Sequence, residues 1–382
     1  MQKNILIIGG GLAGLTAAIH LSGAGFKVLL IEKNGYPHHK VCGEYISNEV
    51  LPYLQWLHAD PYLLHPVSIS KLEFNTGNDK KYEAVLPLGG FGISRYAFDQ
   101  FLYNIAIQNG CNIVQDQVSE VLFNDDTFTV KTSSGQIFDA DVVLGAYGKR
   151  SNLDIKIDRP FIHQKSPWLA VKQHYKGKFN NELVGLYCFA GGYCGVSKVE
   201  GDIINVCYIT DYTSFKKHKD IEAHKQHVLY KNPVLKKILQ ECTPLFERPI
   251  TISQISFEQK NTIEDHILMI GDSAGLINPL CGNGMAMAIH SAKLAAENVI
   301  EYLNGNISRL QMEQQYTQQW NQHFKARIKM GQWIAHLFRK KYLSVVTNIA
   351  FKIWPGILNK IIAGTHGQPI KINAAHEYNI QK

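Results

Sequence analysis

The chain has 382 residues, of which 45% are apolar and 19% are charged, a composition typical of a globular protein with one large or two medium domains. Its formal net charge of +7 comes from scattered Lys and Arg residues, and no basic tract with interleaved aromatic residues indicates nucleic-acid binding. The charge suits an anionic cofactor or an anionic membrane surface.

Seven cysteines form no C-x-x-C pair and no zinc-finger spacing, which favours reduced thiols in a cytosolic protein. We see no cleavage site after the first apolar run, and no uninterrupted apolar stretch reaches the roughly eighteen residues of a membrane-spanning helix. The sequence therefore predicts a cytoplasmic protein, with peripheral contact at the inner membrane face left open.

An apolar run from Asn4 to Ile8 ends in a glycine-rich turn with the spacing G-x-G-x-x-G. An alanine-rich helical pattern follows over residues 15–22, and a second apolar run over residues 27–31 ends at Glu32. Strand, glycine turn, helix, strand and terminal acid in this order predict a dinucleotide-binding unit. At this point NAD and FAD are both open.

The residues of this unit have separate roles in the predicted site. Gly9 allows the tight turn, Gly11 lets the backbone approach a pyrophosphate, and Gly14 lets helix and strand pack closely. The helix N-terminus offers unpaired N–H groups to the phosphates, and a terminal carboxylate can accept ribose hydroxyls. The predicted nucleotide contacts are Gly9, Gly11, Leu12, Ala13, Gly14, Glu32 and Lys33.

The remaining pattern alternates helical and strand signals. Helices are predicted over residues 47–57, 95–109, 215–230, 234–241 and 285–303, and the chain after 305 reads as helical to about residue 363. Strands are predicted over residues 68–76, 81–86, 111–115, 118–123, 128–132, 137–138, 141–145, 168–175, 183–189, 194–198, 203–209 and 266–270.

Two further glycine-rich turns follow apolar strands. One is G-A-Y-G-K-R-S from Gly145 through Gly148 to Ser151, and the other runs from Gly271-Asp272 through Pro279 to the G-x-G at Gly282. Such turns gather at one edge of an open parallel sheet, where ligands bind.

This arrangement resembles the flavoprotein superfamily of monooxygenases and geranylgeranyl reductases, which has the fold of para-hydroxybenzoate hydroxylase. There the first motif binds the ADP half of FAD. The middle motif, G-A-D-G-x-x-S, is matched with Tyr147 in place of the Asp, and the third, G-D-x6-P-x-x-G-x-G, is matched fully. The resemblance spans about residues 1–305 and implies FAD rather than NAD.

The resemblance also implies how the later motifs hold the flavin half. Asp272 would accept hydrogen bonds from ribityl hydroxyls, with a turn cap as its alternative role. The helix opening at Gly282, Asn283, Gly284 and Met285 would direct N–H groups at the flavin pyrimidine edge and stabilise negative charge on reduced flavin. Arg95, in an R-x-x-x-D-x-x-L helix start, would lie near the cofactor unless it is an ordinary surface residue.

The segment from Lys40 to Glu44 departs from monooxygenases and resembles the C-G-E segment of the reductase branch. In that branch the Cys lies beside the flavin ring. We therefore expect Cys42 and Gly43 at the cofactor, with the Cys42 thiol shaping the site or donating a proton. The alternative is a small Cys that packs a turn, and Glu44 is left as a structural residue.

Tyr193 is the best match to the first position of the branch's Y-x-W-x-F-P segment. The Trp, Phe and Pro positions hold Gly195, Ser197 and Lys198, so two large apolar walls are lost and a geranylgeranyl substrate is put in doubt. Tyr193 is predicted as a cavity residue, against the alternative of a plain sheet aromatic.

The sequence lacks the signature motifs of other classes of flavin enzyme. The W-x-W-x-I-P segment of tryptophan halogenases is missing, as are a second G-x-G-x-x-G and a redox-active C-x-x-x-x-C. Electrons are expected from transiently bound NAD(P)H or from an electron-donor protein. The pair His38-His39 has no carboxylate at ligand spacing, and we predict no metal site.

The predicted architecture is α/β. A Rossmann-like FAD-binding domain with a parallel sheet (residues 1–152 and 257–305) interleaves with an antiparallel-sheet substrate domain (153–256), to which residues 68–94 contribute. A helical C-terminal region covers 306–382. Its part from Trp333 to Ile362 would lie on a membrane surface or, as we favour, close the substrate cavity.

We predict an FAD-dependent oxidoreductase that passes a hydride from reduced flavin to a carbon–carbon double bond of a hydrophobic substrate of isoprenoid, lipid or polyene type. The alternative is a monooxygenase that uses NAD(P)H and O₂ to hydroxylate an aromatic or polyene compound. A non-catalytic flavin-binding redox protein is a lesser alternative, because such a protein would not need the large second sheet domain.

Overall fold

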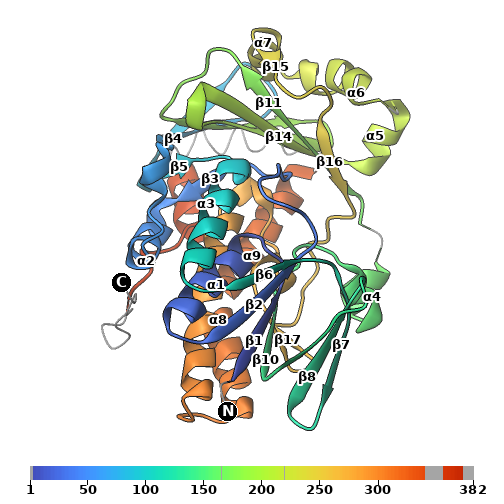
Figure 1. Cartoon of the computed structure of the whole chain (residues 1–382). Helices are drawn as coiled ribbons and strands as arrows, with labels where there is room; N and C mark the ends of the chain where they lie inside the picture. The colour runs from blue at the N-terminus through green and yellow to red at the C-terminus, as the bar shows by residue number, and fades with distance from the viewer. Residues whose placement is uncertain (1–2, 165, 219, 340–355, 373–382) are drawn as a thin grey trace.

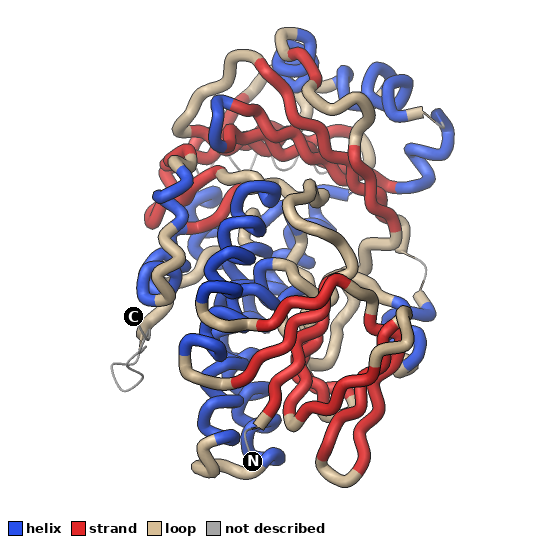
Figure 2. Tube along the Cα trace, in the orientation of Figure 1, coloured by secondary structure: helices blue, strands red, loops and turns tan. Residues whose placement is uncertain are grey.

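The computed structural model describes residues 3–164, 166–218, 220–339 and 356–372. In this part of the chain one large sheet crosses the upper half of the molecule, and two smaller sheets lie beside long helices in the lower half (Figures 1 and 2). The mixed α/β fold with parallel and antiparallel sheets is the predicted one.

The parallel sheet carries the three glycine-rich turns. Its strand order among the described residues is β17-β18-β10-β1-β2-β6, and every neighbouring pair is parallel except β17 with β18. The strands are β1 Asn4–Ile8, β2 Lys27–Glu32, β6 Asn112–Gln115, β10 Val142–Gly145, β17 Ile263–Glu264 and β18 Ile267–Met269. Ile8 is level with Gly145, and Gly145 with Met269, so the turns that follow these strands meet at one sheet edge as predicted.

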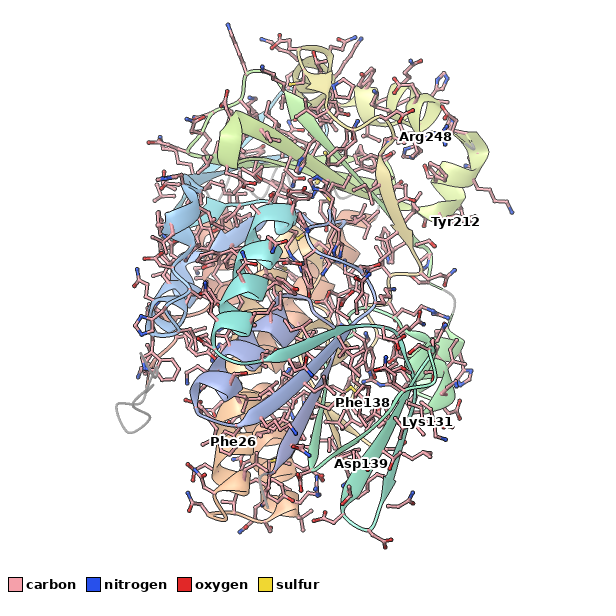
Figure 3. The ribbon with its side chains drawn as sticks, viewed as in Figure 1. Phe26, Lys131, Phe138, Asp139, Tyr212 and Arg248 are labelled. Atoms are coloured by element: carbon pink, nitrogen blue, oxygen red, sulfur yellow. The ribbon has the colours of Figure 1, made fainter. Side chains whose placement is uncertain are left out.

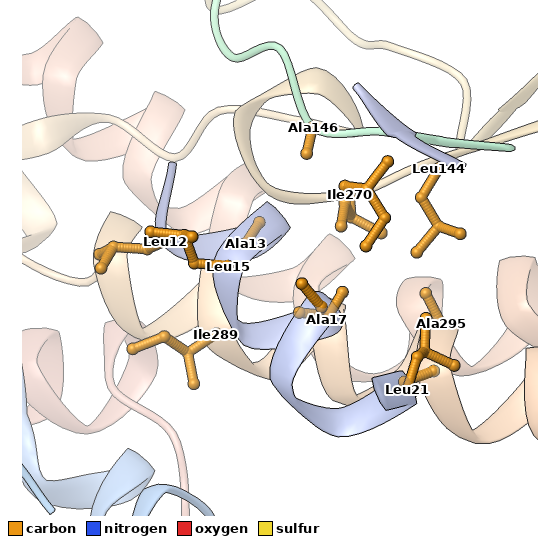
Figure 4. Close-up of a cluster of buried hydrophobic side chains, with 14 of the residues drawn as sticks. Leu12, Ala13, Leu15, Ala17, Leu21, Leu144, Ala146, Ile270, Ile289 and Ala295 are labelled. Atoms are coloured by element: carbon orange, nitrogen blue, oxygen red, sulfur yellow. The ribbon is translucent and has the colours of Figure 1, made fainter. Parts of the chain in front are cut away.

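Helices cover one side of the parallel sheet, and a three-stranded sheet covers the other (Figure 1). The helices are α1 Leu12–Gly23, α3 Arg95–Gln108, α8 Gly284–Leu303 and α9 Arg309–Arg339, and the covering strands are β7 Val118–Asn124, β8 Thr127–Thr132 and β9 Ile137–Ala140. Figure 4 shows Ala17 and Leu21 of α1 in one buried cluster with Leu144 of the sheet and Ala295 of α8. Small side chains let these layers approach closely, which fixes the start of α1 at the sheet edge.

The large sheet is mostly antiparallel and joins two distant parts of the chain. Its order in the described chain is β15-β11-β14-β13-β12-β4-β5-β3, with β16 also on β11, and only β12 with β4 is parallel. Its strands are β3 Tyr45–Ser47, β4 Val67–Asn75, β5 Lys81–Gly92, β11 Trp168–Lys176, β12 Leu183–Phe189, β13 Gly192–Val199, β14 Ile203–Asp211, β15 Thr243–Pro244 and β16 Ile250–Ser253. Residues 68–94 thus include two strands of this sheet, while the proposed domain boundaries stay a prediction.

Short helices complete the fold. They are α2 Leu51–Trp56, α4 Asn152–Lys156, α5 Tyr212–His218, α6 Ile221–His227, α7 Pro233–Gln240 and α11 Ile357–Thr365. The 3₁₀ turns are η1 Asn48–Val50, η2 Pro61–Leu64, η3 Pro160–His163, η4 Glu200–Asp202, η5 Leu229–Lys231, η6 Gly271–Ser273 and η7 Pro279–Cys281. In Figure 1, α7 lies at the top of the large sheet, and α6 and α5 lie at its upper right.

One helix prediction was wrong. Residues 215–230 form two helices rather than one, because the Asp220 side chain accepts a hydrogen bond from Ala223 N (2.8 Å) and starts a new helix. The helix predicted over residues 47–57 is present from Asn48, as the 3₁₀ turn η1 followed by α2, and only Ser47 belongs to β3. The strands β15 and β16 were not predicted.

The C-terminal region is helical in α9 and α11. Much of the predicted membrane-surface or cavity-closing element lies outside the described residues, which leave out 340–355. Among the helices that the structure describes, none combines the length and apolarity needed to cross a bilayer.

Candidate active site

A cavity of about 580 Å³ lies between the turns of the parallel sheet and the inner face of the large sheet. Its polar end is lined by residues from the glycine-rich turns and the end of β2. Its apolar end is lined by Leu72, Phe74, Leu86, Val184, Leu186, Leu280, Leu358, Ile361 and Ile362. The arrangement connects a nucleotide-like cradle to a hydrophobic chamber.

Most predicted site residues line this one cavity. They are Gly11, Leu12, Ala13, Glu32, Lys33, Cys42, Gly43, Arg95, Gly148, Tyr193, Gly271, Asp272, Pro279, Gly282, Gly284 and Met285. Gly9, Gly14 and Asn283 do not line the cavity. Contact of any of these residues with a cofactor stays a prediction.

Residues that do not line the cavity support its walls, as Gly9 and Asn283 show. Gly9 has φ +103°, and a Cβ there would lie 2.5 Å from the Ala146 carbonyl oxygen. Asn283 donates from its side-chain amide to the Thr365 carbonyl (3.0 Å), which ties the end of α11 to the start of α8. Sequence motifs do not separate such supporting residues from residues that touch a ligand.

Two helices direct their N-termini at the cavity. Helix α1 begins at Leu12 and α8 at Gly284, and neither has a side-chain cap among the described residues or an acidic residue in its first turn. Their first N–H groups have no partner within the helix, and each positive dipole end favours negative charge. The residues present therefore fit FAD, and α1 would hold its pyrophosphate while α8 would stabilise its flavin ring.

Glu32 is oriented by hydrogen bonds from its own neighbourhood. One carboxylate oxygen accepts from Gly10 N (2.6 Å), and the other accepts from the backbone and side chain of Asn34 (3.0 and 3.1 Å). Oε1 thus already accepts two hydrogen bonds, whereas Oε2 accepts only one and can accept a second, so the cavity-lining carboxylate can still receive a ribose hydroxyl.

The second and third turns are linked directly. Gly148 N donates to Ser273 Oγ (2.9 Å), and Lys260 Nζ donates to the carbonyl oxygens of Lys149 and Asp272 (both 2.8 Å). Burial lowers the pKa of Lys260 to about 8. These bonds hold the backbone of Asp272, while its carboxylate has no hydrogen-bond partner among the described residues and lines the cavity.

Replacing Asp272 with Ala should weaken FAD binding by roughly 10- to 100-fold, since a hydrogen bond to a charged acceptor is worth about 1.5–3 kcal/mol. The dissociation constant can be measured by titrating apo-protein with FAD. Asp139→Ala is the matched control, because Asp139 is exposed on β9, far from the cavity lining (Figure 3). Equal affinities for both variants would contradict the ribityl role.

Positive groups converge beside the cofactor end. Arg95 holds Asp99 with two bonds (2.6 and 2.8 Å), and Lys40 pairs with the same carboxylate (2.9 Å). Burial opposes ionisation of Asp99, but the cations Arg95 and Lys40 outweigh it and hold its pKa below its usual range. Arg95 is therefore fixed at the cavity wall.

A buried charged cluster that was not predicted from the sequence centres on Glu44. Glu44 is fully buried, where it accepts from Lys172 Nζ and, at 2.7 Å, from His174 Nε2. The strand pattern contained a usable signal. Ala170, Lys172 and His174 alternate along β11 and therefore share one face, and Ala170 of this face lines the cavity.

Cys42 and Tyr193 lie where the two ends of the cavity meet. Cys42 Sγ is 3.4 Å from Sδ of Met285 at the start of α8. The Tyr193 hydroxyl donates to Asn278 Oδ1 (3.4 Å), and its ring packs with apolar groups on both sides. Burial raises the Tyr193 pKa well above its usual range, so the phenol stays protonated.

The apolar walls come from different residues than the reductase motif would supply. Gly195 lines the cavity without filling it, Ser197 donates to the Gly43 carbonyl (3.4 Å), and Lys198 pairs with Asp202. Helix α11 and the strands β4, β5 and β12 provide the hydrophobic surface instead.

The chain is similar to known flavoproteins. The model of the FAD dependent oxidoreductase family matches residues 4–41. The chain is 21% identical to digeranylgeranylglycerophospholipid reductase 1 of Methanopyrus kandleri, over 91% of this chain and 96% of that protein. It is 23% identical to tryptophan 2-halogenase of Chondromyces crocatus (85% and 66% covered) and 22% identical to conditioned medium factor receptor 1 of Dictyostelium discoideum (86% and 69%). The chain spans about two thirds of the length of these last two relatives.

Solved structures share the fold. The flavin-dependent halogenase CmlS matches with a TM-score of 0.78 at 18% identity, over 99% of this chain and 75% of that one. A geranylgeranyl bacteriochlorophyll reductase-like protein from Thermoplasma acidophilum matches with a TM-score of 0.76 at 20% identity, over 95% and 96%. At these identities the likeness shows the fold alone.

Fold, cavity and family match together define an FAD-dependent oxidoreductase. Within that class its relatives include digeranylgeranylglycerophospholipid reductases and a halogenase, which agrees with the resemblance to flavoproteins seen in its three motifs.

Proposed function

We propose that the protein reduces a carbon–carbon double bond of a hydrophobic substrate, with NAD(P)H as external electron donor. The observation that carries the proposal is the apolar chamber that opens onto the cofactor end of the same cavity at Cys42 and Tyr193. The reductase relatives, named for a lipid substrate, support it. A protein electron donor and contact with a membrane surface remain predictions.

The chain's own residues would bind the substrate and supply a proton. The chamber walls bury hydrocarbon, at about 25 cal/mol per Å², and exclude water. Reduction adds a hydride and a proton across the double bond, and the hydride is what bound FAD supplies once NAD(P)H has reduced it. The proton would come from the Cys42 thiol, which solvent then reprotonates, while the protonated Tyr193 hydroxyl helps to orient the substrate.

The decisive experiment separates reduction from oxygenation. The flavin is reduced anaerobically, and isoprenoid or polyene lipids are added, chosen after mass spectrometry of any co-purified ligand. Formation of saturated product without oxygen supports the proposal. Product that appears only in air and carries oxygen from labelled O₂ would replace it with the monooxygenase alternative.

Cys42→Ala should lower anaerobic turnover by roughly 100-fold at unchanged FAD content, the loss typical of a missing proton donor. Turnover per bound flavin is the measurement. Cys242→Ala is the matched control, because Cys242 is also half-buried but lies outside the cavity lining. Full activity of the Cys42 variant would show that this thiol only packs against its neighbours.

A further inference from the structure

The five residues 40–44, here called the 40–44 loop, all line the cavity between its two ends. Their carbonyl groups are held from the large sheet. Lys172 Nζ donates to the carbonyl of Lys40 (3.1 Å), Asn205 Nδ2 to that of Cys42 (3.2 Å), and Ser197 Oγ to that of Gly43 (3.4 Å). The donors belong to β11, β14 and β13, so three neighbouring strands fix one face of the loop.

Glu44 is the centre of this arrangement. Besides Lys172 and His174, its carboxylate accepts from Arg95 N (2.7 Å), and its carbonyl accepts from Ile93 N (3.1 Å). Its φ of +53° lies in the left-handed region that non-glycine residues seldom adopt. Such a conformation persists only where surrounding contacts impose it.

Stability alone does not explain these residues. Lys172 and Glu44 are both fully buried, and the cost of removing two charges from water can exceed their mutual attraction. Replacing such a buried pair with well-packed apolar residues is often neutral or stabilising. What the charged cluster adds is a fixed orientation of the 40–44 loop.

That orientation exposes the opposite edge of the loop. In a trans peptide the N–H points away from the C=O. Because the Cys42 and Gly43 carbonyls face the sheet, the N–H groups of Gly43 and Glu44 face away from it, and neither has an acceptor among the described residues. A Cβ built on Gly43 meets no described atom within 4 Å, so open space adjoins these donors.

We propose that Glu44, Lys172 and His174 are positioning residues that lock the 40–44 loop with its Gly43 and Glu44 N–H groups turned into the cavity. Adjacent N–H groups beside a left-handed residue form a concave donor site for anionic or carbonyl acceptors. With the FAD placement proposed above, on which the inference rests, the acceptor is the flavin ring, and the donors favour its negatively charged reduced form.

The test uses Glu44→Gln, which keeps the shape but removes the charge, and Lys172→Met. In apo-protein, trypsin should cut after Lys40 at least 10-fold faster in both variants, because the loop is no longer held. In the holo-protein, FAD should bind roughly 10-fold more weakly, and the flavin should have a lower reduction potential. None of these readouts needs substrate, so they report on the loop even if the proposed reaction is wrong.

Two comparisons separate positioning from general destabilisation. Glu73→Gln is the matched control, because Glu73 is 3% exposed in the same sheet, pairs with Lys81 (3.0 Å) and lies outside the cavity lining. It should leave flavin potential and cleavage after Lys40 unchanged. His174→Gln retains a hydrogen-bond donor for Glu44. It should therefore keep closer to wild-type values the cleavage rate, FAD affinity and flavin potential that His174→Ala changes. Folded Glu44 and Lys172 variants with wild-type cleavage, affinity and potential would overturn the proposal.

Discussion

Replacing Arg159 with Met should lower the free energy of unfolding by about 3–5 kcal/mol, the cost of breaking a buried ion pair and leaving its partner uncompensated. Arg159 is 1% exposed, and its guanidinium pairs with Asp154 (3.0 Å) and Glu264 (3.2 Å). It also donates to the carbonyls of Ser273 (3.0 Å) and Asn261 (2.9 Å). The substitution would leave the fully buried Asp154 and two carbonyl groups without this donor.

The same variant should lose FAD affinity although Arg159 does not line the cavity. Asp154 belongs to the capping box that begins α4 directly after the second glycine-rich turn, and Ser273 follows Asp272 in the third. Arg159 therefore holds two cofactor turns in register. Urea unfolding and FAD titration measure the two effects.

Arg248→Met controls for loss of an arginine as such, since Arg248 is exposed at the top of the large sheet (Figure 3). Its urea midpoint and FAD affinity should match the wild type. An Arg159 variant as stable as the Arg248 variant would show that the buried cluster is replaceable by apolar packing.

The sequence predicted those parts of the site that local pattern encodes. Gly9, Gly148 and Gly271 each follow a buried strand, and the parallel pairing of β1, β10 and β18 brings their turns together without further information. Cys42 and Tyr193 were predicted from the resemblance to the reductase branch instead, and both line the cavity, although their roles there stay predictions.

The sequence did not reveal partnerships between distant charges. Glu44 and His174 are separated by 130 positions, and Arg159 and Glu264 by 105. Each alone has the appearance of a surface residue, because charged side chains are seldom fully buried without a partner. The alternation along β11 shows that Lys172 and His174 share a face, but only the pairing of β11 with its neighbours brings Lys172 under the 40–44 loop.

Gly14→Ala should destabilise the protein by about 3 kcal/mol and weaken FAD binding at least 10-fold. A Cβ at position 14 would lie 1.9 Å from the Gly9 carbonyl oxygen and 3.2 Å from Cβ of Ala146. Both neighbours belong to turns that end buried strands, so neither can yield as a flexible side chain would. Overpacking of this kind typically costs about 1–3 kcal/mol, and a backbone neighbour puts this case at the upper end.

The loss of affinity has a specific cause. Gly14 does not line the cavity, whereas Leu12 and Ala13 do. Relief of the clash requires α1 to move away from β1, and this moves the first N–H groups of the helix away from the pyrophosphate position. Thermal or urea unfolding of apo-protein measures the packing cost, and FAD titration below the unfolding range measures the displacement.

Gly356→Ala is the matched control, because a Cβ at Gly356, the N-cap of α11, meets no described atom within 4 Å and the backbone there is right-handed. It should leave both quantities unchanged. If Gly14→Ala lost stability but kept wild-type FAD affinity, the helix N-terminus would not be a phosphate donor. Loss of both would tie cofactor binding to how closely α1 approaches the first strand.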